Sequence, residues 1–216
     1  MMAWELLTFV GTIAFAMSGS INAMEEEYDI LGVFLLGLVT AFGGGMIRNV
    51  LIEVSPLMIW QETELILAAI AASSLVYFVP NVWFRHVRKW IFFDAVGLAA
   101  FSIQGALYAA QKGLPLPAIV MAALLTGSGG GMIRDVLTKR KPLIFREEVY
   151  GVWAMLGGLL IGLGFGRDGW ELYASFGLIL ALRMMSVHWN WRLPRRQFRH
   201  RALSSGGSEP SNVGVS

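Results

Sequence analysis

A ten-residue stretch occurs twice in this chain, and each copy places three consecutive glycines and an arginine inside an apolar run. The first copy reads FGGGMIRNVL from Phe42, and the second reads SGGGMIRDVL from Ser128. The copies are offset by 86 residues, and the same offset relates Thr40 to Thr126 and further positions on both sides without a gap. The sequence therefore contains an internal duplication, and this predicts a fold in which the same structural unit occurs twice.

The composition predicts a membrane protein. Of the 216 residues, 56% are hydrophobic and 15% are charged, whereas a soluble globular domain carries about 25% charged residues. Apolar runs near the length of roughly 20 residues that a bilayer-spanning helix needs occur at 4–24, 30–54, 64–79, 91–110, 116–137, 149–165 and 170–187. We therefore expect an all-α membrane protein with seven transmembrane helices.

The duplication divides these seven spans into two repeats of three spans each, with one span left over. We expect a first repeat over 1–84, a second over 85–168, a seventh transmembrane helix over 169–191, and a basic, then disordered, tail over 192–216. Because three is an odd number, the second repeat enters the membrane upside down relative to the first. In proteins built from such inverted repeats, the functional site lies near mid-membrane where the repeats meet.

The distribution of lysine and arginine predicts the orientation. Two basic residues, Lys112 and Arg167, fall on the same side of the predicted membrane as the N-terminus. Twelve fall on the opposite side: Arg85, Arg88, Lys89, Lys139, Arg140, Lys141, Arg146, Arg192, Arg195, Arg196, Arg199 and Arg201. Because cytoplasmic loops carry the excess of basic residues, we expect the N-terminus outside and the C-terminus in the cytoplasm.

The glycine triplets and the arginines beside them need an explanation. A glycine in a helix interior costs roughly 1 kcal/mol relative to alanine, and an arginine at the centre of a span costs about 2.5–3.5 kcal/mol. In one interpretation, the small residues allow two helices to pack closely. In the other, the triplets interrupt the second and fifth spans, and the unwound backbone lines a polar path. Contiguous glycines cover about 200° of a helix, so we favour the interruption, although both can hold together.

Polar residues near the triplets are the candidates for this path. Arg48 and Arg134 either line the path or extend towards the membrane surface. Because neighbouring positions on a helix differ by about 100°, Arg134 and Asp135 are expected on different faces, and Asp135 either lines the path or pairs with Lys139. The candidate pathway residues are Gly43, Gly44, Gly45, Arg48, Asn49, Gly129, Gly130, Gly131, Arg134, Asp135, Ser18, Gln104, Thr40 and Thr126.

The sequence shows no signature of an enzyme or of a cofactor site. It contains no cysteine and three scattered histidines, and no nucleophile–base pair, metal-ligand spacing or phosphate-binding loop occurs. We therefore expect no enzymatic activity, no cofactor, no metal site and no nucleic-acid partner.

The twin GGGMIRN and GGGMIRD segments, on the second and fifth of seven spans, resemble the prokaryotic branch of the trimeric intracellular cation channel family. The resemblance covers about residues 4–188. It implies a homotrimer in the bacterial plasma (inner) membrane, with potassium or sodium ions and membrane lipids as partners. It also implies one potassium-permeable pore in each protomer, between the repeats, where the second and fifth helices are kinked at the glycines. Asn49 departs from the pattern of the second copy, which has Asp135 at the equivalent position.

Some bacterial proteins of similar sequence are described as transporters of small amino acids, with glycine among the proposed substrates. Two classes of function therefore stay open. A monovalent cation channel needs a continuous polar path, whereas a secondary carrier for a small zwitterion needs a closed binding pocket.

Overall fold

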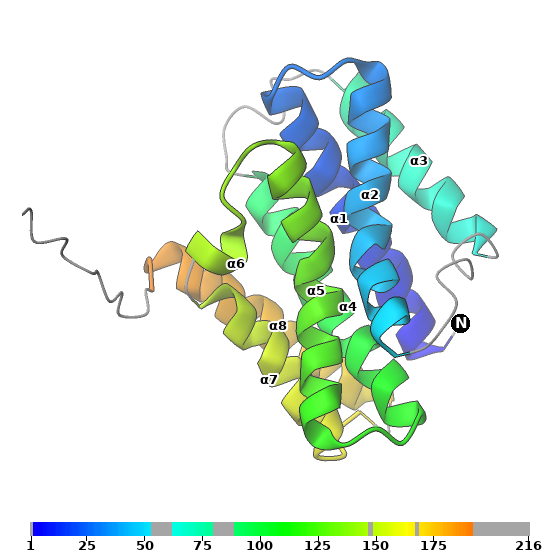
Figure 1. Cartoon of the computed structure of the whole chain (residues 1–216), viewed down its shortest axis with the longest axis vertical. Helices are drawn as coiled ribbons and strands as arrows, with labels where there is room; N and C mark the ends of the chain where they lie inside the picture. Colours follow the sequence, from blue (N-terminus) through cyan, green and yellow to red (C-terminus); the bar gives the residue numbers. More distant parts are fainter. Residues whose placement is uncertain (1, 53–61, 80–88, 147–148, 167–168, 192–216) are drawn as a thin grey trace, which may run out of the picture.

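The computed structural model is a bundle of α-helices (Figure 1), and it describes residues 2–52, 62–79, 89–146, 149–166 and 169–191. No β-strand occurs within these residues. The helices are α1 (Ala3–Glu25), α2 (Ile30–Leu51), α3 (Thr63–Phe78), α4 (Lys89–Gln111), α5 (Leu116–Leu137), α6 (Leu143–Arg146), α7 (Tyr150–Gly162) and α8 (Gly169–His188). Within the described residues, α1, α2, α4, α5 and α8 are long and apolar enough to cross a membrane, and α3 and α7 are shorter apolar helices.

The all-α prediction is confirmed, and each predicted span coincides with a helix. The predicted span 116–137 has the bounds of α5, and the span 149–165 contains α7. The span 30–54 coincides with α2, although its last two residues lie outside the described part of the chain. The four-residue helix α6 was not expected from the sequence. That all seven apolar helices cross the membrane stays a prediction.

Local sequence signals fix where the helices begin. The side chain of Asp29 accepts a hydrogen bond of 2.8 Å from the backbone N–H of Gly32 and thereby caps the first turn of α2, as its position in the sequence predicts. Pro115 and Pro117 open α5, where a proline costs nothing because the first helical N–H groups have no partner within the helix.

Helices α1, α2, α4 and α5 form the centre of the bundle (Figure 1). α3 packs against α1 and α2 on one side, while α7 and α8 pack against α4 on the other. The buried rings of Phe15 and Phe101, which occupy equivalent positions in the two copies, meet between α1 and α4 with their centres 5.2 Å apart. The equivalent helices of the two copies therefore pack against each other at the core.

Helices α2 and α5 cross at the glycine triplets. A methyl group added to Gly44 would collide with the carbonyl oxygen of Thr126, and one added to Gly130 would collide with the carbonyl oxygen of Thr40. Both helices nevertheless stay α-helical through the triplets. The prediction that the triplets interrupt the second and fifth spans is therefore wrong. The missing side chains bring two intact helices into backbone contact, so that no backbone hydrogen bond is given up inside the membrane.

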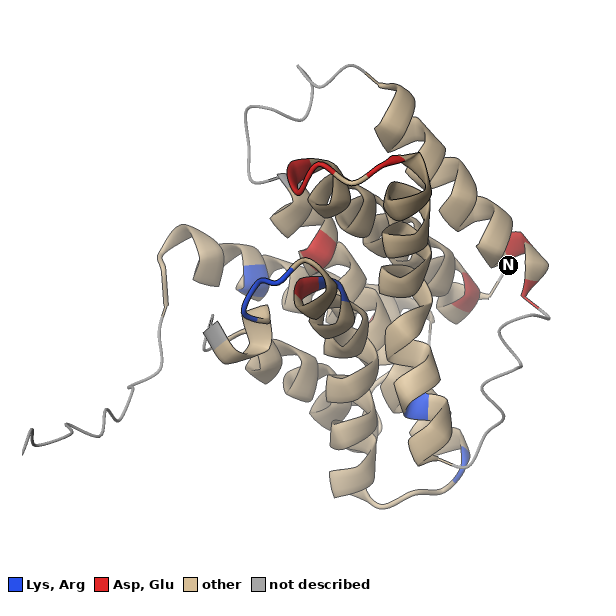
Figure 2. Ribbon diagram, turned by 45° about the horizontal axis from the view of Figure 1, so that its top comes forward, with Lys and Arg blue, Asp and Glu red and all other residues tan. Residues whose placement is uncertain are grey.

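The two ends of the bundle are held by different contacts. At the α1–α2 end, which comprises the loop 26–29 and the end of α5, Arg140 pairs with Glu25 at 3.0 Å and also bonds Glu26. The α4–α5 end comprises the loop 112–115 and the end of α2. There the side-chain ammonium of Lys112 donates a hydrogen bond of 3.2 Å to the carbonyl oxygen of Ile52. Most of the charged residues in Figure 2 lie near such helix ends and in loops, as expected for helices that cross an apolar medium.

Candidate functional site

The first of two buried polar clusters surrounds Arg134 on α5 and is called the Arg134 cluster: Arg134, Asp135, Asp94 and Ser18. The Arg134 guanidinium donates from Nη1 to Asp94 Oδ1 at 2.8 Å and to Ser18 Oγ at 2.7 Å. It also donates from Nε at 2.9 Å and from Nη2 at 2.7 Å to Asp135 Oδ1. All four side chains are buried. One cation thus lies between two carboxylates in a sealed network that joins α1, α4 and α5.

The Arg134 cluster overturns two expectations about Asp135. Arg134 and Asp135 were expected on different faces of the helix, but the long arginine side chain folds back onto its neighbour. The alternative that Asp135 pairs with Lys139 is also wrong. The second carboxylate oxygen of Asp135 instead accepts a hydrogen bond of 2.9 Å from the backbone N–H of Leu143. Arg134 is fully buried, so it does not extend to the surface of the bundle.

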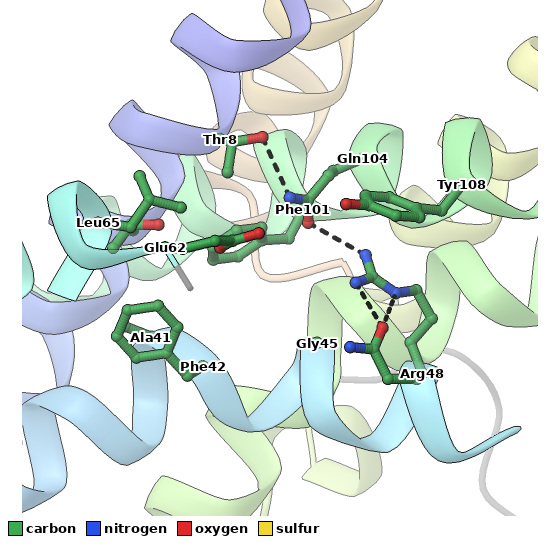
Figure 3. Close-up of a pocket in the computed structure, with 12 residues that line it drawn as sticks. Thr8, Ala41, Phe42, Gly45, Arg48, Glu62, Leu65, Phe101, Gln104 and Tyr108 are labelled. Carbon is green, nitrogen blue, oxygen red and sulfur yellow. Dashed lines mark hydrogen bonds between the residues drawn. The ribbon is translucent and has the colours of Figure 1, made fainter. Parts of the chain in front are cut away.

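The second cluster surrounds Arg48 on α2 and is called the Arg48 cluster: Arg48, Asn49, Gln104, Thr8 and Tyr108 (Figure 3). Arg48 donates from Nε at 3.0 Å and from Nη2 at 2.7 Å to Asn49 Oδ1, and from Nη1 at 3.3 Å to Gln104 Oε1. Gln104 Nε2 in turn donates 3.1 Å to Thr8 Oγ1. The guanidinium carbon lies 4.1 Å from the centre of the Tyr108 ring. Arg48 is 5% exposed, and it too remains inside the bundle.

The offset of 86 residues relates the two clusters position by position. Asn49 binds Arg48 with the same pair of hydrogen bonds that Asp135 makes to Arg134. Gln104 likewise occupies the position of Ser18, and Thr8 occupies that of Asp94. Gln104 accepts from Arg48 as Ser18 does from Arg134, whereas Thr8 accepts from Gln104 instead of from the arginine. Both carboxylates are thus replaced by neutral side chains. Among the described residues, no carboxylate lies within ion-pair distance of Arg48.

A cavity opens beside Arg48. The volume that the centres of water molecules can occupy in this cavity is about 40 Å³. The residues that line it are Thr8, Thr12, Ala41, Phe42, Gly45, Arg48, Asn49, Glu62, Leu65, Phe101, Gln104 and Tyr108. A wider hollow of about 520 Å³ shares Thr8, Glu62, Leu65 and Gln104 with the cavity and adds Glu5 and Glu64 to its wall. Arg48 therefore lies at the inner end of an acid-lined entrance.

Glu62 stands directly before α3 and lines both the cavity and the hollow. Burial raises the pKa of the Glu62 carboxyl, while the nearby positive charge of Arg48 opposes the rise. The carboxylates of Glu62, Glu5 and Glu64 together line the entrance, and such a group of carboxylates attracts cations from solution.

The predicted pathway residues fall into three groups in the structure. Arg48, Asn49 and Gln104 meet in one cluster, and Ser18, Arg134 and Asp135 meet in the other. Gly45 borders the first cluster and Gly131 the second, while the remaining glycines lie at the crossing of α2 and α5. The hydroxyl groups of Thr40 and Thr126 donate at 2.6 Å to carbonyl oxygens of their own helices. Their role in a pathway stays a prediction.

Sequence reasoning missed Asp94, Thr8, Tyr108 and Glu62. Asp94 carried a usable signal, because a carboxylate within a predicted transmembrane span usually has a partner or a function. Thr8 could then have been found as its equivalent, 86 residues earlier. Within the described ranges, no group of three or more His, Cys, Asp or Glu side chains is placed to hold a metal ion.

Comparison with known proteins identifies the family. A family model described as glycine transporter matches residues 5–81 and 91–165. A solved structure described as a prokaryotic TRIC (trimeric intracellular cation) channel in 0.5 M KCl is 32% identical, with a TM-score of 0.79 over 88% of this chain and 98% of that chain. The chain belongs to the TRIC family.

Further TRIC relatives match along most of their length. A TRIC orthologue from Rhodobacter sphaeroides is 31% identical with a TM-score of 0.77, over 87% of this chain and 98% of that one. The UPF0126 membrane protein YvgT of Bacillus subtilis is 53% identical over 92% of this chain and 98% of its own length. The UPF0126 inner membrane protein YadS of Escherichia coli is 34% identical over 87% and 93%, respectively. This TRIC chain is accordingly a multi-pass membrane protein.

Proposed function

We propose that this TRIC protein is a potassium-permeable channel for monovalent cations, with one pore in each protomer. The observation that carries the proposal is the acid-lined hollow that leads to the polar cavity at Arg48, inside a fold shared with cation channels. The pore runs from this entrance past the crossing of Gly44 and Gly130 to the Arg134 cluster. The ion pairs of that cluster form the barrier that ions meet last.

The proposed pore lies between two inverted three-helix repeats, 1–84 and 85–168, followed by the seventh transmembrane helix 169–191 and the tail 192–216. The reciprocal contacts support this organisation, because Gly44 faces Thr126 and its equivalent Gly130 faces Thr40, the equivalent of Thr126. A two-fold axis in the membrane plane relates contacts in this way.

The orientation and assembly belong to the same proposal. The N-terminus faces outwards, so that Arg48 lies towards the outside and Arg134 towards the cytoplasm. Of the basic residues behind this assignment, Arg85, Arg88, Arg167 and those after residue 191 lie outside the described part of the chain. The bacterial inner membrane is supported by the name of the E. coli relative, and a homotrimer by the description of the R. sphaeroides protein as trimeric.

A carrier of small amino acids such as glycine is the second candidate function. The description of the matching family model and the small cavity at Arg48 favour it. A carrier exchanges labelled glycine across proteoliposomes without steady potassium current, whereas a channel passes that current without glycine.

A thiol placed in the cavity tests the proposed pore. The chain contains no cysteine. A Cβ atom added to Gly45 would have Arg48 Nη2, at 3.9 Å, as its nearest neighbour among the described residues outside the backbone of its own helix. We expect a membrane-impermeant, positively charged thiol reagent to reduce potassium efflux from proteoliposomes severalfold in Gly45→Cys, and only from the side facing the hollow. Gly177→Cys is the matched control, because a Cβ atom there meets nothing within 4 Å. Full labelling of Gly45→Cys with unchanged efflux would place the pore elsewhere.

A further inference from the structure

The two arginine clusters differ in their balance of charge. Arg134 lies between two carboxylates, at 2.8 and 2.7 Å. The equivalent positions hold Thr8 and Asn49, which carry no negative charge. Asn49 accepts hydrogen bonds from Arg48, whereas Thr8 accepts one from Gln104. The fold thus builds the same arginine site twice, and among the described residues it places carboxylates within ion-pair distance of the arginine in one copy.

The missing counter-charge leaves Arg48 ready to bind an anionic group. A guanidinium with 5% exposure loses most of its hydration, and this loss is expensive unless a negative charge compensates it. Three of its five N–H groups donate to Asn49 and Gln104. One N–H on each terminal nitrogen is left for a further acceptor, and a carboxylate is the acceptor that a guanidinium binds most strongly.

The space for such an acceptor is present and polar. The cavity at Arg48 includes Thr8, which is the position of the carboxylate in the Arg134 cluster. The buried hydroxyl of Thr12 also lines the cavity and has no hydrogen-bond partner among the described residues. Glu62 faces the cavity from a separate segment (Figure 3), so that a cationic group and an anionic group both border the same small space.

We propose that the Arg48 cavity is a binding site for a small zwitterion, an amino acid of about the size of glycine. Its carboxylate accepts hydrogen bonds from Arg48 in the place that the Asp94 carboxylate takes in the Arg134 cluster. Its ammonium group faces Glu62. This inference rests on the second candidate function, the carrier, and assigns its binding site. It goes beyond cation conduction. Binding of the ligand itself requires neither conduction nor exchange.

The size of the cavity fits this ligand class. Space of about 40 Å³ for water centres holds roughly three water molecules, at about 10–15 Å³ each. A ligand with five non-hydrogen atoms replaces these waters when its ammonium end extends towards the hollow that shares Glu62. Gly45 contributes to the fit, because no side chain of its own enters the space.

Thermal unfolding of the full-length protein in detergent measures the binding directly. We expect glycine to raise the unfolding temperature in a saturable manner, because a ligand that binds the folded state alone stabilises it. Acetate and methylammonium, each carrying one of the two charges, are compared at the same ionic strength and should give clearly smaller shifts. A shift from acetate that equals the shift from glycine would overturn the zwitterion assignment, as would no shift from glycine at all.

A pair of variants at Thr8, one charged and one neutral, identifies the site. Thr8→Asp supplies the carboxylate that the second copy has at this position, so it should pair with Arg48 and abolish the glycine-dependent shift. Thr8→Ser leaves this space open and adds no charge, so it should retain the shift. Persistence of the shift in Thr8→Asp would overturn the proposal.

Two further variants keep the test decisive if a Thr8 variant does not fold. Arg48→Gln should weaken glycine binding by about tenfold or more, the usual effect of losing a hydrogen bond to a charged group. Glu62→Gln should weaken the binding of glycine while leaving that of acetate unchanged. Unchanged glycine affinity in either variant contradicts the assignment. A protein that conducts potassium without binding glycine overturns this inference alone, and one that binds glycine without conducting overturns the channel alone.

Discussion

Replacing Gly130 by alanine is expected to lower the free energy of unfolding by about 3 kcal/mol or more, the upper part of the range for overpacked sites. The added methyl group would collide with the carbonyl oxygen of Thr40, which is backbone and has no rotamer to move away. Gly44→Ala should have a similar effect, because its methyl group would meet the carbonyl oxygen of Thr126. The yield of folded protein in size-exclusion chromatography and its thermal unfolding measure the loss.

Gly177→Ala is the matched control for this prediction. A Cβ atom at Gly177 on α8 has no neighbour within 4 Å, so alanine there should be neutral or stabilise the helix by up to about 1 kcal/mol. If Gly130→Ala were as stable as Gly177→Ala, the backbone contact between α2 and α5 would not exist as described. The glycine triplets would then have to be explained in another way, since α2 and α5 continue through them without a break.

Replacing Asp94 by alanine is the second change with a large expected effect. It leaves the fully buried Arg134 with one of its two carboxylates, and removing one partner from a buried ion pair typically costs about 3–5 kcal/mol. The equivalent variant Thr8→Ala removes two neutral hydrogen bonds, one accepted from Gln104 and one donated to the carbonyl oxygen of Trp4. Each is expected to contribute about 0.5–1.5 kcal/mol, and the second lies within the first turns of α1, where the carbonyl keeps its helical partner, so a smaller loss than for Asp94→Ala is expected. Thermal unfolding of the two variants side by side measures this difference.

A triple variant separates charge from packing in the same experiment. Asp94→Ala combined with Arg134→Met and Asp135→Asn removes the cation together with both of its carboxylates, and neutral side chains in place of buried ion pairs are often tolerated. The triple variant should therefore be more stable than Asp94→Ala alone. Equal destabilisation by Thr8→Ala and Asp94→Ala would show that the charge balance of the Arg134 cluster contributes nothing.

Much of the fold could be predicted from the sequence, because a bilayer imposes a length and a composition on each helix. The span 116–137 and the cap at Asp29 were placed correctly for this reason. The effect of the glycine triplets could not be predicted in the same way. Contiguous glycines permit both a break in a helix and a close crossing. What decides between them is the backbone of the other helix, at Thr126 for Gly44 and at Thr40 for Gly130, more than 80 residues away in the sequence.

The candidate site could be predicted where its residues occur in both copies of the duplicated sequence. It could not be predicted where a turn or the packing of two helices brings the interacting residues together. The spacing of four residues pointed from Asp135 to Lys139, but α5 ends at Leu137 and Lys139 has a positive φ of 56°. The chain therefore leaves the helix before the pair can form, and the turn returns the N–H of Leu143 to Asp135 instead. The pairing of Asp94 with Arg134 joins two helices, and helical periodicity within one span carries no information about it.

The two clusters together suggest how a cation would pass. The Arg48 cluster is reached through the acid-lined hollow, whereas the Arg134 cluster is sealed by its own ion pairs. The described conformation is thus accessible from the α4–α5 end and closed at the Arg134 cluster. On the pathway that we propose, passage requires that Arg134 release at least one of its carboxylates.

The measurement that tests the proposed channel most directly is a planar-bilayer recording of the purified protein with a gradient of KCl across the membrane. We predict steady unitary currents that reverse near the equilibrium potential of potassium and persist when glycine is absent. Currents that reverse near the equilibrium potential of chloride would contradict the account. So would the absence of current in protein that exchanges labelled glycine across proteoliposomes, since that result would establish the carrier instead.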